Sequence, residues 1–136
     1  MKEMITYLTF DGNCREAMKF YERCLGGQLL VVPFSEAPGD FPPEAKDKVM
    51  HATLKLGPAA LMASDTMPGA TLQQGNNFHI CINPESLEET QRLFAALGEN
   101  GRITMPLQDT FWGAHFGMVA DQFGIQWMFN FEKPKA

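Results

Sequence analysis

The side chains suited to acid–base or metal chemistry are few, because the sequence has 3 histidines and 3 cysteines against 9 methionines and 11 phenylalanines. His79 lies in a stretch of alternating side chains, where residues on the same side recur every second position. The alternation puts His79 and Cys81 on one side of a strand. Because imidazole exchanges protons near neutral pH, His79 is a candidate catalytic base or hydrogen-bond donor to a substrate. The alternative is a histidine whose ring nitrogens bond only to backbone or water.

The remaining candidates are weaker. Cys81 beside His79 suggests a thiolate nucleophile, but side chains two apart on a strand are about 6–7 Å apart, so we expect a small buried cysteine. His51 and His115 occupy roughly corresponding places in the two halves. With Glu44 or Asp109 they are candidates for an unusual metal site, although nothing in their spacing demands one and we favour a chance pair of surface-strand histidines.

Methionines and aromatic residues suggest an apolar ligand pocket. Polarisable, flexible Met62 and Met128 are able to line it, and the other predicted lining residues are Thr6, Leu8, Phe10, His79, Cys81 and Trp112. Alternatively, these side chains only fill the interior.

Composition restricts the class of protein. The chain has 136 residues, a net charge of −5, 45% hydrophobic and 20% charged residues, values typical of one ordered domain over residues 1–136. The acidic balance disfavours nucleic acid or an anionic membrane as a partner, and no apolar run suits a membrane span. Three scattered cysteines form neither a disulfide framework nor a zinc pattern, so we expect a reducing, cytoplasmic environment.

The predicted elements repeat. The first half reads as strand 4–10, a helix starting at an Asn13 cap, strand 28–34, a loop over 35–47, and strands 51–56 and 59–64. The second half reads as strand 76–82, a helix starting at Asn83-Pro84, strand 103–107, a loop, and strands 114–120 and 125–131.

A shift of 73 residues superposes Thr6 on His79 and Ala17 on Thr90, and a shift of 66 superposes Met62 on Met128. The expected fold is α+β, built from two βαβββ modules over about 1–68 and about 72–136.

Two loops are expected to carry function, at Ser35–Asp47 and Pro106–Gly113. Phe111 and Trp112 in the second loop suit either a ligand lid or a dimer contact, and we favour a contact at the edge of both dimer and pocket.

Several segments resemble one protein family. They are 10–21 (FDGNCREAMKFY), Leu25-Gly26, Met50-His51-Ala52, 62–65 (MASD), 110–113 (TFWG) and 121–128 (DQFGIQWM). Together they resemble the vicinal oxygen chelate superfamily of glyoxalase, bleomycin-resistance and dioxygenase proteins. The closer similarity is to its PhnB-like branch, also labelled as related to 3-demethylubiquinone methyltransferase.

The resemblance implies that the two modules form a U-shaped half-barrel whose concavity holds metal and substrate, and that the protein is a homodimer. It does not support methyl transfer. The sequence lacks the glycine-rich turn after a strand, and the length, that a nucleoside-type methyl donor needs.

In the metal-dependent relatives, His, Glu or Gln from the first and last strand of each module hold the ion. Carried over, these positions are Thr6, Met62, His79 and Met128. Only His79 is a usual ligand of a divalent metal, so we expect neither metal nor other cofactor.

The expected function is therefore metal-free binding of a small apolar or aromatic molecule. The alternative is a lyase, isomerase or dioxygenase-like enzyme that uses His79 or an unusual His51/His115 site. A third possibility is a domain that serves only assembly.

Overall fold

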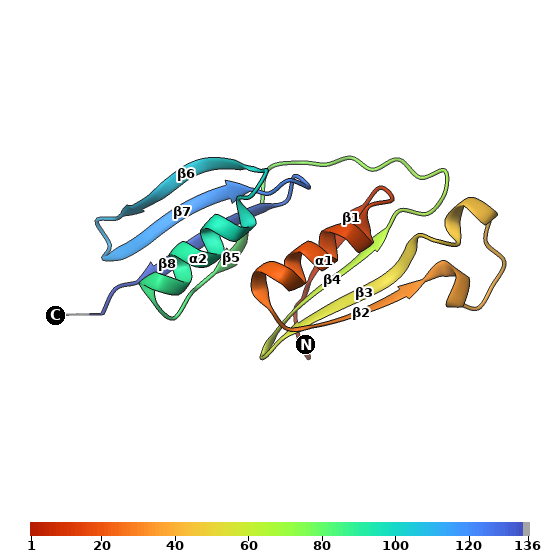
Figure 1. The fold of residues 1–136 in the computed structure, drawn as a ribbon, viewed down its shortest axis with the longest axis horizontal. Helices are drawn as coiled ribbons and strands as arrows, with labels where there is room; N and C mark the ends of the chain where they lie inside the picture. The colour runs from red at the N-terminus through yellow and green to blue at the C-terminus, as the bar shows by residue number, and fades with distance from the viewer. Residues whose placement is uncertain (135–136) are drawn as a thin grey trace. The chain divides into compact units, whose positions relative to one another are not determined.

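The computed structural model describes residues 1–134, which form two units, Met1–Gln74 and a second that begins at Gly75. Each unit is a four-stranded sheet with one helix (Figure 1). The first contains β1 (Thr6–Phe10), α1 (Cys14–Leu25), β2 (Gln28–Pro33), two 3₁₀ helices (Phe34–Glu36 and Pro43–Ala45), β3 (Val49–Leu56) and β4 (Ala59–Asp65). The second contains β5 (Ile80–Ile82), α2 (Leu87–Leu97), β6 (Arg102–Asp109), β7 (Ala114–Ala120) and β8 (Gln126–Glu132).

Both sheets follow the same path. Their strand orders are β1-β4-β3-β2 and β5-β8-β7-β6. The first pair in each order is parallel, and the other pairs are antiparallel. The predicted α+β fold of two βαβββ modules is confirmed.

Each helix covers one face of its own sheet, which we call the helix-covered face. We call the opposite face of the sheet the open face. In α1, Ala17, Phe20, Tyr21 and Cys24 recur at helical spacing, and all four are buried. A shift of 73 carries these four onto the buried side chains of α2: Thr90, Leu93, Phe94 and Leu97. The repeat of the helices is thus a repeat of core positions.

Local signals misplaced some boundaries. The second helix begins at Leu87, not at Pro84, because the Ser86 hydroxyl accepts a hydrogen bond from the Glu89 amide and caps it. Asn13 precedes the first helix but makes no side-chain cap. The fifth strand is only Ile80–Ile82, since just these residues pair with β8.

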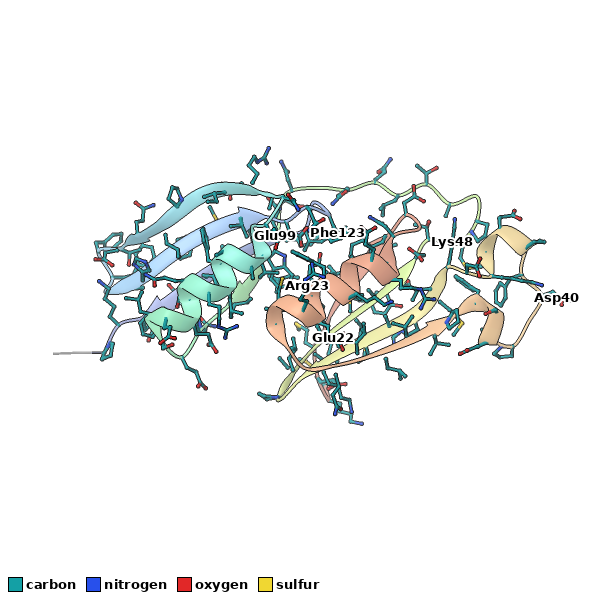
Figure 2. All side chains as sticks on the ribbon, viewed as in Figure 1. Glu22, Arg23, Asp40, Lys48, Glu99 and Phe123 are labelled. Carbon is teal, nitrogen blue, oxygen red and sulfur yellow. The ribbon has the colours of Figure 1, made fainter. Side chains whose placement is uncertain are left out.

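The two predicted loops also differ from expectation. The first carries two 3₁₀ helices, and Asp40 lies at the tip between them (Figure 2). The second is shorter than predicted, because Pro106–Asp109 continues β6 through a register shift and only residues 110–113 form the turn.

One buried carboxylate stabilises each unit. Asp65 accepts hydrogen bonds from the amides of Gly12, Cys14 and Val49, which joins the β1–α1 turn to β3 and β4. Asp121 accepts from two amides of its own turn and from the Trp127 indole. Among residues 1–134, no helix is long and apolar enough to cross a membrane.

Candidate functional site: the open faces of the two sheets

Met62 lies in the middle of the open face of the first sheet. Strand register places Tyr7 directly beside it on β1 and Thr53 directly beside it on β3. Because directly paired residues share a face, these three side chains form a row across the strands. Leu30 of β2 pairs with Thr53 and extends the row to the edge of the sheet.

A hydrogen-bonded chain connects the two hydroxyl groups of this row. The Tyr7 hydroxyl lies 3.3 Å from Nδ1 of His51, and Nε2 of His51 lies 3.0 Å from Oγ1 of Thr53. The Tyr7 and His51 rings are 5.8 Å apart between centroids. Both imidazole nitrogens therefore have a hydroxyl partner, which fixes the ring on the open face.

A groove of about 580 Å³ lies beside this chain. It is lined by Gln28, Leu29, Leu30, Thr53, Lys55 and Met62. Thr53 belongs both to the groove and to the hydrogen-bonded chain. A molecule in the groove therefore contacts the Thr53 end of that hydrogen-bonded chain.

Three predicted pocket residues lie on the other side of the sheet. Leu8 and Phe10 are 4% and 3% exposed and belong to the core under α1. Thr6 pairs with Leu61 and shares their side. The prediction that these three line a pocket with Met62 is wrong. Neighbouring residues of a strand point to opposite faces, and the residue beside Met62 is Tyr7 rather than Thr6.

The equivalent row of the second sheet carries sulfur. Cys81 pairs with Met128, and Met128 pairs with Met118. Met105 of β6 pairs with Met118 and completes the row. The two first strands are thus offset by 74 residues and not by the predicted 73, so Cys81 corresponds to Tyr7, and Ile80 rather than His79 corresponds to Thr6.

His79 precedes β5, so its predicted place on one side with Cys81 remains a prediction. Cys81 is exposed, which corrects the expected buried cysteine. Partial burial nevertheless raises the pKa of its thiol, which is the opposite of what a nucleophilic thiolate needs.

Trp112 lies in the β6–β7 turn next to two other aromatic rings. Its ring is 5.0 Å from Phe111 and 5.9 Å from Phe116 between centroids, and its indole N–H donates to Oδ1 of Asn130. Phe111 is 98% exposed. The structure thus places Trp112 with Phe116 and Asn130, while its expected role at a ligand or dimer contact remains a prediction.

His51 and His115 are not equivalent. His115 shares its side of β7 with Gly117, which packs against the Phe94 ring of α2, so it points to the helix-covered side. Its Nδ1 lies 2.9 Å from Asp109, which also contacts Lys133. Hydrogen bonds from Lys133 and then His115 lower the pKa of Asp109. Glu44 is in the second 3₁₀ helix of the first unit and joins no such cluster among residues 1–134.

The central open-face side chains of the two sheets are poor ligands for a divalent metal. At the equivalent register positions the donors are a phenol, a thiol and two thioethers, at Tyr7, Cys81, Met62 and Met128. Hard and borderline divalent ions prefer carboxylate and imidazole. Within the described part of the chain, no group of three or more His, Cys, Asp and Glu side chains is placed to hold an ion.

Sequence reasoning missed Tyr7 and the partners of His51. A usable signal was present: in residues 6–10 the apolar alternation of Leu8 and Phe10 assigns them to the core and turns Tyr7 to the open face. The contacts of His51 depend on cross-strand register, which spacing alone does not give.

Comparisons with known proteins agree with this architecture. Residues 5–129 match the model of the Glyoxalase/Bleomycin resistance protein/Dioxygenase superfamily. Protein YjdN of Escherichia coli (strain K12) is 35% identical, with 93% of each chain covered.

Two solved structures are similar over nearly the full chain. Protein PA1353 from Pseudomonas aeruginosa is 45% identical with a TM-score of 0.90, covering 98% of this chain and 100% of that one. A PhnB protein from Bacillus cereus, whose name includes 3-demethylubiquinone-9 3-methyltransferase, is 26% identical with a TM-score of 0.76, covering 96% and 99%. The chain therefore belongs to the Glyoxalase/Bleomycin resistance protein/Dioxygenase superfamily, with a PhnB protein among its structural neighbours.

Proposed function

We propose that the protein binds a small apolar or aromatic molecule in the groove of the first sheet, without a divalent metal. The observation that carries this proposal is the groove itself. Its volume of about 580 Å³ lies within the roughly 300–1,000 Å³ common for small-molecule sites. Leu29, Leu30 and Met62 supply apolar surface, and a few polar groups lie among them.

The direct test is saturable binding of an apolar fluorescent probe, N-phenyl-1-naphthylamine. We expect Leu30→Asp to abolish it, because a carboxylate then stands in the apolar lining. Ile103→Asp is the matched control, since Ile103 is likewise an exposed edge-strand residue, 56% against 64% exposed, but belongs to β6. Equal binding by wild type and Leu30→Asp would exclude the groove.

The metal-free part of the proposal needs its own measurement. The protein is purified without chelator, its metal content is determined, and probe titrations are repeated with Ni, Zn, Mn or Fe added. We expect no stoichiometric ion and no change in affinity. One tightly held divalent ion per chain would contradict the proposal.

One observation favours an enzymatic alternative, a lyase, isomerase or dioxygenase-like activity. His51 lies between two hydroxyl groups, so it is placed to accept a proton from one and return a proton through the other. His51→Ala should then abolish turnover of any substrate found while the fold is retained. His79→Ala tests the other candidate histidine, and unchanged turnover in both variants would exclude this alternative.

We also propose that the protein is a cytoplasmic homodimer in which the exposed Phe111 and Trp112 contribute to the contact. Large exposed aromatic side chains are enriched at interfaces. Sedimentation of the wild type and of Phe111→Ser tests the dimer. A monomeric wild type would contradict it.

A further inference from the structure

The Tyr7–His51–Thr53 chain has a fixed hydrogen-bond balance. A neutral imidazole has one donor and one acceptor nitrogen, and each hydroxyl has one proton to donate. One hydroxyl must therefore donate to His51 and the other must accept from it. The hydroxyl that accepts keeps its own proton free for another partner.

Two tautomers satisfy this balance. If Tyr7 donates to Nδ1, then Nε2–H donates to Thr53, and the Thr53 proton is free. If Thr53 donates to Nε2, then Nδ1–H donates to Tyr7, and the Tyr7 proton is free. Only the first arrangement offers a donor at Thr53, which lines the groove.

The charge around the groove has one sign. Lys55 is its only charged lining residue, and the described lining contains no Asp or Glu, although the whole chain carries a net charge of −5. Thr53 and Lys55 lie two residues apart on β3, so both side chains point to the open face. An ammonium group and a hydroxyl donor therefore face the same end of the groove.

We propose that this end recognises an anionic hydrogen-bond acceptor, a carboxylate or sulfonate, attached to the apolar body of the ligand. Thr53 donates to the anion, His51 in turn donates to Thr53, and Tyr7 donates to His51. Lys55 supplies the opposite charge, while Leu30 and Met62 contact the apolar body. This inference rests on the proposed function and names its ligand class.

A matched pair of probes tests the proposal. 8-Anilinonaphthalene-1-sulfonate carries a sulfonate, and N-phenyl-1-naphthylamine has the same aromatic body without it. We expect the anionic probe to bind at least several-fold more tightly. Because a hydrogen bond to a charged group is worth roughly 1.5–3 kcal/mol, Thr53→Val should weaken the anionic probe about tenfold or more and the neutral probe less than twofold.

Conservative variants separate hydrogen bonding from packing. Thr53→Ser keeps the hydroxyl and should retain most of the anionic affinity. Lys55→Met should weaken the anionic probe about two- to fivefold, the range of an exposed charge pair, and leave the neutral probe unchanged. His115 lies outside the Tyr7–His51–Thr53 chain of hydrogen bonds. His115→Gln should therefore change the affinity of neither probe.

The possible failures are distinguishable. If both probes bind with equal affinity and Thr53→Val affects them alike, the anion-recognition inference is overturned while groove binding stands. If neither probe binds saturably, or Leu30→Asp changes neither, the proposed function itself is overturned.

Discussion

The open faces of the two sheets share one register but carry different chemistry. In the first sheet the central row contains Tyr7, Met62 and Thr53. In the second it contains Cys81, Met128 and Met118. Only the methionine in the middle is common to both rows, and the flanking hydroxyls of the first sheet become sulfur groups in the second.

The same register assigns Phe116 as the counterpart of His51, because each lies two residues before the partner of the central methionine. All three members of the hydrogen-bonded chain thus have counterparts without a comparable donor or acceptor. A duplicated backbone has left acid–base groups in one unit and polarisable apolar groups in the other. Function is therefore better sought within the first sheet than at a site that needs equal contributions from both.

The largest expected effect concerns the buried carboxylates on which both faces depend. Asp65→Ala should destabilise the protein by about 3–5 kcal/mol, because three amides from two separate segments lose their acceptor. Asp121→Ala should cost less, about 2–3 kcal/mol, since the two amides that bond to it lie within one turn. Urea unfolding followed by circular dichroism measures both.

Asp11→Ala is the control for these variants, since Asp11 is exposed beside the same turn and its side chain bonds to the hydroxyl of half-buried Thr66. It should change the free energy of unfolding by no more than about 0.5 kcal/mol. Equal costs for Asp65→Ala and Asp11→Ala would contradict the role of the buried carboxylate.

The next effect tests whether the two backbones are equivalent. Gly27 packs against the carbonyl of Lys55, and Gly101 packs against the carbonyl of Ala120, its counterpart in the second unit. Alanine at either position would bring Cβ into that carbonyl, so each should cost about 2–4 kcal/mol. Gly27→Ala should cost more, because Gly27 also has a φ of +89°.

Gly26→Ala separates the two causes. Gly26 has a φ of +81° and a ψ of −155°, but no atom lies within 4 Å of the place that the new Cβ would occupy, so its variant should cost only backbone strain, about 1–3 kcal/mol. Similar costs at Gly26 and Gly27 would show that the close carbonyl contributes little.

Apolar periodicity was sufficient to predict the two modules and the core face of the first helix. Ala17, Phe20 and Tyr21 repeat at helical spacing, and burial follows directly from that spacing. The site was harder to predict from the sequence because it depends on the register between β1 and β4. One residue of register exchanges Thr6 for Tyr7, which is the difference between the helix-covered and the open face.

A smaller effect addresses the chemical difference between the faces directly. His51→Phe installs the residue found at the equivalent place in the second sheet. It should lower affinity for 8-anilinonaphthalene-1-sulfonate about tenfold, because Thr53 loses the partner that orients its proton. Phe116→His should create no such affinity, since Cys81 and Met118 flank it instead of two hydroxyls. A gain of affinity in that variant would contradict the importance of the complete chain.

The smallest effect on the fold is expected at Cys81. Cys81→Ser should change the free energy of unfolding by no more than about 0.5 kcal/mol, because the side chain is exposed.

In the native protein only Cys81 should react with a disulfide reagent, since Cys14 and Cys24 are buried and burial raises the pKa of Cys14 to about 12. The pKa of Cys81 is also raised by burial, so its thiolate fraction at neutral pH is lower than that of an unperturbed thiol. Its labelling should therefore be slower than that of free cysteine at pH 7 and should keep accelerating as pH rises through the ordinary thiol pKa. A labelling rate that already levels off below that pKa would indicate an activated thiolate and would make the second open face the more reactive one.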